Sequence, residues 1–351
     1  MLKQSIQKFS LNKVIMGYTV SLILFVIAFC LAITIGTVHV PIKEMLRIFW
    51  GTFFGSHEGI EPMLTTIVLN IRFPRVVLAA LVGASLAIAG AAFQGLLKNP
   101  LADPYTLGVS SGAAVGAVMT IFLGITIPGL GGFTLPVVSI IAALVTLILV
   151  LGFARLVEQS MKMETIILTG IIFSSFLGSI LSLMIALTGE ELRQIITWLL
   201  GSVSMRGWEY IRLIAPFFIF GSAILMWNAR ELNAMAFGEE RAHHLGVNVQ
   251  ARKYWVLASG SLLTGAAVAV SGTIGFIGLV VPHMVRRAWG SDHHHVLPLS
   301  MINGASLLII CDLVARTIVS PTELPIGVIT ALLGAPVFGL ILMRQRRERR
   351  G

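Results

Sequence analysis

Residues 70–116 read NIRFPRVVLAALVGASLAIAGAAFQGLLKNPLADPYTLGVSSGAAVG. The apolar run from Val76 to Leu97 is long enough to cross the hydrocarbon core of a bilayer, which takes about 20 residues. Asn99-Pro100 and Asp103-Pro104 then stop the helix. Free backbone groups cannot face lipid, so the loop must lie outside the hydrocarbon or line a protein cavity. This stretch therefore predicts a membrane helix followed by a turn that protein or water surrounds.

The whole chain shares this apolar character. Of its 351 residues, 56% are hydrophobic and only 12% are charged, whereas soluble domains average about 25% charged residues. No polar stretch is long enough to build a soluble domain. We therefore expect residues 1–351 to form a single transmembrane domain embedded in a lipid bilayer.

The apolar runs predict an all-α polytopic membrane protein with about ten transmembrane helices and one short surface helix. The first run is too long for a signal-peptide core and is expected to be retained as a helix. We place the transmembrane helices at 14–36, 63–97, 107–126, 135–157, 164–188, 209–229, 250–272, 275–289, 298–316 and 325–343, and the surface helix at 191–203.

The basic residues predict the orientation of these helices. With both termini in the cytoplasm, the inner side carries about twice as many Lys and Arg residues as the outer side. The net charge of +9 might suggest a nucleic-acid partner. However, the basic residues sit at the ends of apolar segments, where they orient a membrane protein, so we expect no nucleic-acid binding.

A weak internal repeat suggests two inverted pseudo-repeats, a common plan among transporters. Chance is the alternative, because glycine is abundant in this chain. At a constant offset, Gly83, Gly90 and Pro100 recur as Gly265, Gly272 and Pro282. Small residues at helical spacing also allow helices to approach closely in lipid. The residues that we assign to the transport pathway or to helix packing are Gly83, Gly90, Asn99, Pro100 and Gly108.

Four blocks along the chain carry a resemblance to a known family. They are R-x-P-R at 72–75, N-P-L-A-D-P at 99–104 with L-G-V-S-S-G at 107–112, G-F-I-G-L-V-V-P-H at 275–283, and E-L-P-I-G-V-I-T at 323–330 with L-G-A-P-V-F at 333–338. In this order, over nearly the whole length, the chain resembles the permease family of ATP-binding cassette (ABC) importers for iron-siderophores, haem and vitamin B12.

This resemblance implies a bacterial cytoplasmic-membrane permease that takes up a ferric siderophore or a related metal chelate by alternating access. It implies a second permease copy or paralogue, two cytoplasmic ATPase subunits and an extracytoplasmic substrate-binding protein as partners. Cobalamin and haem remain alternative substrates. An ion-coupled secondary transporter is a weaker alternative, because such proteins bury acidic residues near the membrane midplane and this chain has almost none there.

The most polar internal segment, residues 231–248, lies on the predicted cytoplasmic side. Its two glycines and its apolar points predict two short helices with a glycine hinge. The resemblance implies that these helices dock on the ATPase subunit, and an ordinary amphipathic loop is the alternative. The residues assigned to this contact are Ala236, Phe237, Gly238, Glu239, Glu240, Arg241, Ala242, Leu245 and Gly246.

The sequence contains no catalytic constellation and no G-x-x-x-x-G-K-[ST] phosphate loop. ATP and its Mg²⁺ are therefore expected on the partner ATPase, and we expect the chain to bind no cofactor and not to be an enzyme itself. Cys30 and Cys311 both lie in apolar runs and predict no disulfide. The histidines at 293–295 are placed in a loop beside Asp292 alone, which does not favour a metal site.

Three arginines on the predicted outer side, Arg72, Arg75 and Arg316, are exceptions to the positive-inside bias. The resemblance implies that they dock the binding protein by pairing with its carboxylates, which the planar guanidinium group suits. The alternative is that they reach the lipid headgroups and that Arg316 pairs with Asp312 one turn back on the same helix.

Overall fold

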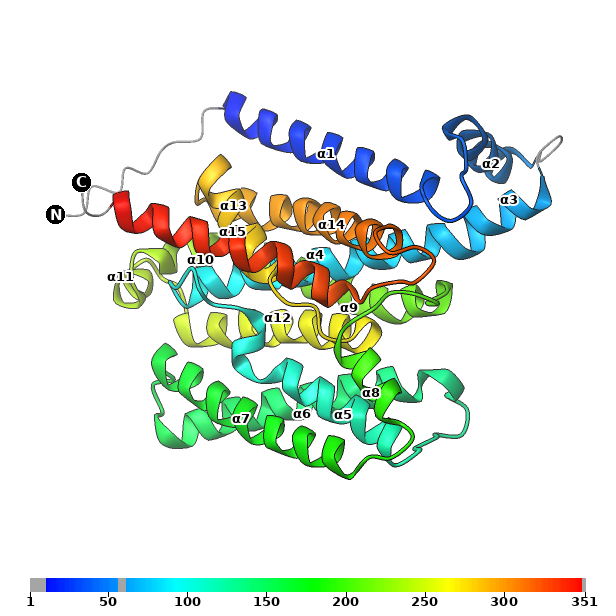
Figure 1. Cartoon of the computed structure of the whole chain (residues 1–351). Helices are drawn as coiled ribbons and strands as arrows, with labels where there is room; N and C mark the ends of the chain where they lie inside the picture. Colours follow the sequence, from blue (N-terminus) through cyan, green and yellow to red (C-terminus); the bar gives the residue numbers. More distant parts are fainter. Residues whose placement is uncertain (1–10, 56–60, 349–351) are drawn as a thin grey trace.

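Every regular element in residues 11–55 and 61–348, the ranges that the computed structural model describes, is a helix (Figure 1). The all-α prediction is therefore confirmed. The elements are α1 (Leu11–Thr34), α2 (Ile42–Phe54), α3 (Pro62–Thr66), η1 (Ile67–Arg72), α4 (Phe73–Leu96), η2 (Pro104–Leu107), α5 (Val109–Phe122), η3 (Gly131–Phe133), α6 (Thr134–Val157), α7 (Met163–Leu187), α8 (Leu192–Leu199), α9 (Trp208–Trp227), α10 (Ala229–Ala236), α11 (Glu239–His244), α12 (Val249–Ser271), α13 (Ile277–Trp289), α14 (His293–Thr317) and α15 (Ile326–Glu348).

Within these ranges, 7 helices are long and apolar enough to cross a membrane. The longest runs without a break from α3 through η1 into α4, as the prediction of one helix over 63–97 requires. The three remaining predicted segments form α5 and α13, which are shorter helices of 14 and 13 residues, and α15, a helix of 23 residues. The predicted surface helix is α8, which is far too short to span a bilayer.

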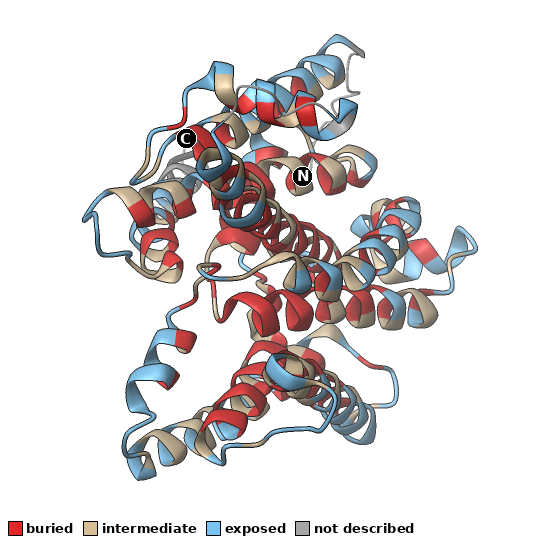
Figure 2. Ribbon diagram, turned by 90° about the vertical axis from the view of Figure 1, so that its right-hand side faces the viewer, coloured by how far each residue is buried: buried red, intermediate tan, exposed pale blue. Residues whose placement is uncertain are grey.

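Three helices, α4, α12 and α14, are the most buried of the long apolar helices. Figure 2 shows that the buried residues (red) gather in the helices at the centre of the molecule. Over an apolar stretch of 18 residues in each span, the share of buried residues is 83% in α4, 78% in α12 and 61% in α14, but only 17% in α1 and in α7. Helices α4 and α14 are antiparallel, because Arg75 meets Asp312 while Gly95 lies against His293. They approach most closely at Gly83 and Gly304, where each glycine lies against the carbonyl of the other. Glycine permits such backbone contact in a membrane protein.

The molecule has two ends that the helices connect (Figure 1). We call the end with α10 and α11 the α11 end, and the end with α2 and α3 the α2 end. Helix α4 begins at the α2 end, where Arg75 reaches Ser204, and helix α12 finishes there, where the Ser271 carbonyl accepts a hydrogen bond from the Ser202 N–H. The two buried helices therefore run in opposite directions.

Each of these two helices is followed by an irregular segment and then by a short helix, α5 in the first case and α13 in the second. This is the arrangement that an inverted repeat predicts. The residue correspondence holds only in part. Gly83 and Gly265 both lie inside buried helices, but Gly90 lies inside α4 whereas Gly272 ends α12 with a φ of +71°.

Two helices differ from the prediction, one that was not predicted and one that begins earlier than predicted. The amphipathic helix α2, which the Glu44–Arg47 ion pair bridges on its exposed face, was not predicted, because it is too short to be a span. Helix α14 begins at His293 rather than at 298, so the three histidines form its first turn rather than a loop. The reason is the N-cap: the Asp292 carboxylate accepts a hydrogen bond from the His294 N–H at 3.0 Å.

Candidate functional site

Arg72 lies at the α2 end and is only 5% exposed. Its guanidinium donates hydrogen bonds to the carbonyls of Ile33 and Thr34, at 2.7 and 3.1 Å, and to the carbonyl of Val38. The last carbonyls of a helix have no partner within the helix. Arg72 therefore ties the end of α1 and the segment after it to the start of α4.

Arg75 and Arg316 share one buried carboxylate, Asp312. Arg75 donates from Nη2 to Asp312 at 2.8 Å and from Nη1 to Glu323 at 2.7 Å. Arg316 lies 3.7 Å from Asp312 and also donates to the carbonyl of Ala32. We call Arg72, Arg75, Asp312, Arg316 and Glu323 the arginine network.

The structure thus brings the three predicted arginines together, but it turns all of them inward. The predicted pair between Arg316 and Asp312 on one face of α14 is present. Buried charges are stable only when partners satisfy them, and here those partners come from α1, α14 and the segment 318–325. Glu323, whose side chain is 40% exposed, is the acidic member of the network that solvent reaches. A role of the arginines in docking stays a prediction.

At the α11 end, α10 and α11 are two short helices joined at Gly238 (Figure 1). Gly238 has a φ of +120° and Gly246 has a φ of +82°, values that side chains other than glycine rarely adopt. This is the geometry that the sequence predicted for 231–248, which we call the coupling segment.

The residues assigned to the coupling segment fall into an outer and an inner group. Phe237 is 53% exposed and Leu245 is 71% exposed, while Ala236, Glu240, Arg241 and Gly246 are also on the surface. Ala242 is fully buried, and Glu239 forms an ion pair with Lys253. The outer group presents apolar side chains where a partner could cover them.

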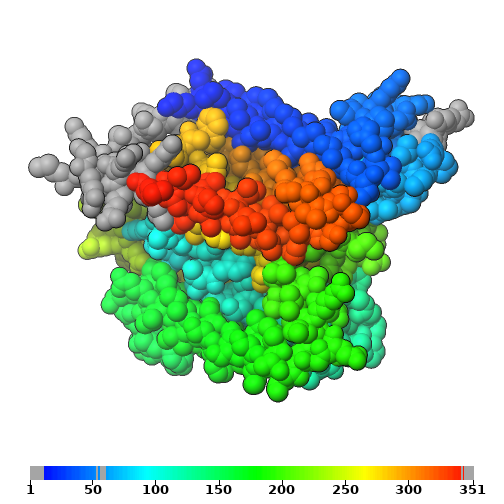
Figure 3. Space-filling model, in the orientation of Figure 1, coloured from blue at the N-terminus to red at the C-terminus, as the bar shows by residue number. Residues whose placement is uncertain are grey.

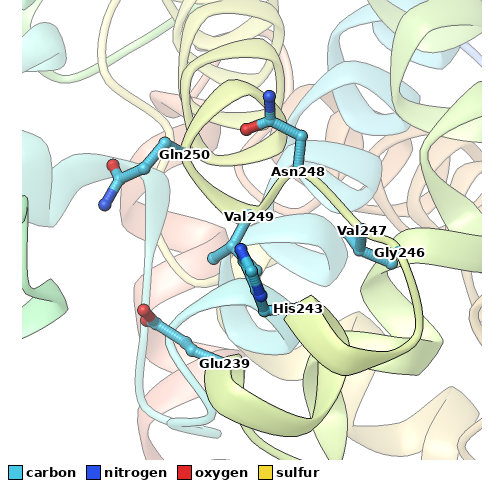
Figure 4. A pocket seen from close by; sticks show the side chains of 7 residues that line it. All are labelled: Glu239, His243, Gly246, Val247, Asn248, Val249 and Gln250. Atoms are coloured by element: carbon cyan, nitrogen blue, oxygen red, sulfur yellow. The ribbon is translucent and has the colours of Figure 1, made fainter.

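A hollow of about 540 Å³ separates α11 from the beginning of α12 (Figure 4). It is lined by Glu239, His243, Gly246, Val247, Asn248, Val249 and Gln250. In Figure 4 the side chains of Glu239 and His243 from α11 face the turn that carries Asn248 and Val249. Four of its lining residues, His243, Gly246, Asn248 and Gln250, are exposed, so the hollow is open to the surface.

The residues assigned to the pathway or to packing are mainly packing and turn residues. A Cβ atom on Gly90 would collide with the carbonyl of Gly278 in α13, so α4 and α13 touch through their backbones. Gly108 has a φ of +79° and lies against Gly170 of α7. In the turn after α4, the Asn99 side chain accepts a hydrogen bond from the Leu101 N–H at 2.9 Å, and Pro100 is exposed.

A second hollow, of about 410 Å³, lies between α5, α7, α8 and the segment 273–275. Figure 3 shows the side of the molecule on which α7 and α8 (green) lie below α15 (red). The hollow is lined by Tyr105, Ser110, Ser111, Ala114, Leu177, Gly178, Leu181, Leu199, Thr273 and Gly275. We call it the hydroxyl hollow.

The sequence did not assign a function to these hydroxyl groups. The available signal was the serine pair in the L-G-V-S-S-G block, close to Tyr105. The Tyr105 hydroxyl is held in place, because it donates to the Ile274 carbonyl at 2.8 Å and accepts from the Ile274 N–H at 3.0 Å.

An all-helical membrane bundle with an inverted pair of buried helices and a glycine-hinged polar segment at one end defines a multi-pass membrane transport protein. The chain belongs to the FecCD transport family, whose family model matches residues 24–344. It is therefore a permease of the ABC importer type, and the predicted family is confirmed.

Individual relatives agree with this assignment. The ABC transporter permease protein YvrB of Bacillus subtilis (strain 168) is 60% identical over 94% of each chain. The cobalamin import system permease protein BtuC of Halobacterium salinarum is 42% identical, covering 83% of this chain and 77% of its own. The hemin transport system permease protein HmuU of Yersinia pestis is 41% identical, covering 81% and 85%.

A solved structure has the same fold. It is described as an inward-facing conformation of a metal-chelate type ABC transporter, and it superimposes with a TM-score of 0.81 at 32% identity. The match covers 94% of this chain and 99% of the other.

Proposed function

We propose that the chain is the membrane-spanning subunit of an importer that takes up a metal chelate by alternating access, with a ferric siderophore as the favoured substrate. The observation that carries this proposal is the coupling segment, an exposed pair of short helices whose inner side is fastened to the buried helix α12. Such a segment can pass a movement from a partner at the membrane surface into the centre of the bundle.

The α11 end is the cytoplasmic end in this proposal, and the coupling segment is the contact with two separate ATPase subunits, which hold ATP and Mg²⁺. The bias of Lys and Arg residues toward this end supports the orientation. The exposed side chains of Phe237 and Leu245 supply the apolar points of the contact.

A second permease copy or paralogue would close the pathway over the hydroxyl hollow. Helix α7, which flanks this hollow, has only three buried residues among its 25, and both α7 and α15 expose large apolar side chains. Lipid could cover those side chains, but the serine, threonine and tyrosine groups of the hollow are poorly suited to lipid contact. A facing permease would instead enclose a water-filled path between the two chains.

The extracytoplasmic binding protein would dock at the α2 end. Arg75 already pairs with Glu323, which is partly exposed, so carboxylates of a partner would meet the arginine network at its rim. Electrostatic pairing of this kind would orient the partner and speed its encounter more than it would add affinity.

Cobalamin and haem are the second candidate substrates, because relatives of 42% and 41% identity carry those names. The residues around the hydroxyl hollow offer hydroxyl groups and small or apolar side chains. Such a lining suits many large chelates, and selectivity would then lie mainly with the binding protein.

The test is reconstitution of the permease with its ATPase and its binding protein in proteoliposomes. Uptake of a ferric hydroxamate, haemin and cobalamin would be measured with and without ATP. We expect ATP-dependent uptake of one chelate that vanadate stops and a protonophore does not. Uptake that follows a proton gradient without ATP would overturn the proposal in favour of a secondary transporter.

A further inference from the structure

The lysine at the beginning of α12, Lys253, is buried to an unusual degree. It is only 1% exposed and is among the largest fully buried side chains of the described residues. Taking an ammonium group out of water costs several kcal/mol, which only well-placed partners can offset. Its partners therefore indicate what the residue holds together.

Those partners lie on two separate segments. Lys253 Nζ donates to the Glu239 carboxylate of α11 at 2.7 Å and to the Met161 carbonyl at 3.1 Å. Met161 belongs to the loop 158–162, which joins α6 to α7. One ammonium group thus holds the coupling segment and the α6–α7 loop at the same time.

The same loop has a second attachment to α12. Gln250, less than one turn before Lys253, donates from Nε2 to the Ser160 carbonyl at 2.6 Å. Arg252, between them, points elsewhere and contacts Glu231 at 3.2 Å and the Asn228 side chain at 3.1 Å. The first two turns of α12 therefore fasten the α6–α7 loop on one side and the junction of α9 and α10 on the other.

The α6–α7 loop leads directly into the wall of the hydroxyl hollow. Helix α7 begins at Met163, immediately after the loop, and its residues Leu177, Gly178 and Leu181 line that hollow. A helix moves as a stiff rod over such a length, so a displacement at its first turn reaches the hollow. The chain of contacts runs from α11 through Lys253 to the loop and then along α7.

We infer that Lys253 is a positioning residue that transmits movement of the coupling segment to α7 and thereby to the wall of the hydroxyl hollow. The inference rests on the proposed function, because the movement at α11 comes from the ATPase. A lysine with a purely structural role would stabilise the beginning of α12 without linking the responses of the two segments that it contacts.

The experiment compares hydrogen–deuterium exchange in the complete transporter, with its ATPase and in nanodiscs, before and after trapping with ATP and vanadate. In the unmodified protein we expect trapping to change exchange both in 231–248 and in 158–166. In Lys253→Met we expect the change in 231–248 to remain and the change in 158–166 to be lost. Lys253→Arg keeps a cation at this site and should restore the joint response.

Two further variants keep the test decisive. Glu239→Gln removes the same ion pair from its outer side, where the carboxylate is 43% exposed, so folding should survive even if Lys253→Met folds poorly. Lys162→Met removes a lysine whose side chain is 67% exposed and pairs with Glu158 of the same loop rather than with α11 or α12, so the two responses should stay linked. Chelate import per ATP hydrolysed should fall by about tenfold in Lys253→Met and Glu239→Gln, the scale of a typical coupling free energy.

The outcomes separate the inference from the proposed function. If 158–166 still responds together with 231–248 in Lys253→Met and in Glu239→Gln, the inference is overturned and the ATPase contact stands. If 231–248 does not respond to trapping in the unmodified protein, the proposed ATPase contact is overturned, and the inference falls with it.

Discussion

The two ends of the bundle are built on opposite principles. At the α2 end, the arginines of the arginine network are buried, and each is bonded to carbonyls or carboxylates of distant segments. At the α11 end, the coupling segment exposes apolar side chains, turns at glycines with positive φ, and is fastened on its inner side by a single buried cation, Lys253. The first arrangement resists displacement because any movement separates buried charges. The second permits displacement because glycine lowers the cost of changing the backbone.

This contrast suits a protein that receives movement at one end and a substrate at the other. The α2 end would act as a fixed frame, and the coupling segment would act as a lever against α12. The helices between the ends differ accordingly, since α4, α12 and α14 are largely buried while α7 is not. Each of the following predictions changes one side of the contrast, beginning with the largest effect.

The largest effect is expected from Asp312→Ala at the α2 end. The substitution removes the carboxylate that Arg75 and Arg316 share and leaves both cations with too few partners. Breaking a buried ion pair typically costs about 3–5 kcal/mol. We expect a large fall in the yield of folded permease and in its thermal midpoint in detergent.

The matched control is Glu44→Ala, which removes an ion pair from the exposed face of α2 at the same end. Exposed pairs contribute about 0–1 kcal/mol, so the thermal midpoint should barely move. Similar losses in the two variants would show that burial of the arginine network does not make the α2 end rigid.

The next effect concerns the contact between α4 and α13 in the centre. Gly90→Leu should prevent folding or block transport, because the new side chain would collide with the backbone of Gly278. A backbone carbonyl cannot move aside as a side chain can, so the cost should lie at or above the upper end of the usual range of about 1–3 kcal/mol. Folded yield and uptake would both be measured.

Gly152→Ala serves as the control for Gly90, because a Cβ atom at Gly152 meets nothing within 4 Å. In an exposed helix interior, alanine stabilises by about 0.5–1 kcal/mol relative to glycine. A fall in stability for Gly152→Ala as large as that for Gly90→Leu would contradict the assignment of Gly90 to close packing.

A smaller effect on folding, with a clear effect on transport, is expected from Gly238→Pro at the α11 end. Proline cannot adopt the φ of +120° found there, and it removes the N–H that bonds to the Met235 carbonyl. Backbone strain of this kind costs about 1–3 kcal/mol and should stay within the coupling segment. Folded yield should therefore persist while co-purification with the ATPase and coupled uptake fall.

Gly238→Ala should give a weaker form of the same result, because alanine keeps the N–H but not the backbone freedom. Gly207→Ala is the control, since Gly207 has no strained φ and its added Cβ meets nothing within 4 Å. Normal coupled uptake in Gly238→Pro would show that the coupling segment is not a lever.

Much of the fold could be predicted from the sequence, because in a membrane protein the length of an apolar run sets the length of a helix. The long α3–α4 rod was predicted on this ground, whereas the turn at Gly238 was predicted from the glycines of a polar segment. Helix α2 was missed because it is an amphipathic helix of 13 residues, which is too short to cross a bilayer. The start of α14 was missed because its signal is a single capping aspartate, Asp292.

The candidate sites were less predictable. The charge pattern placed Arg72, Arg75 and Arg316 at one end of the molecule, but it could not show which way the side chains turn. Their partners are carbonyls such as that of Ala32 and acids far away in the sequence, which only the fold brings together. For Lys253 the sequence contained one signal, a lysine near the start of a long apolar helix. Its two partners, Glu239 and Met161, again depend on the fold.

The smallest effect is expected from Glu323→Gln, which tests the exposed edge of the arginine network. Burial by itself would raise the pKa of Glu323, but hydrogen bonds from Arg75 and Ser204 and the charges of Arg75 and Arg316 outweigh it and lower the pKa. A carboxylate whose pKa is lowered by folding stabilises the folded state fully at pH values above its unfolded pKa, which is about 4.3 for glutamate. This contribution is lost as the pH falls through the lower pKa of the folded state.

The side chain is 40% exposed, so solvent screens the ion pair and its contribution should be about 0.2–1 kcal/mol. The thermal midpoint of Glu323→Gln should thus lie slightly below that of the unmodified protein at pH 7. The two midpoints should converge as the pH is lowered below about 4.3 toward the folded pKa of Glu323. A gap that stays constant with pH would mean that Glu323 acts by packing alone. The exposed edge of the α2 end would then not be an ionic contact that a partner's carboxylate could replace.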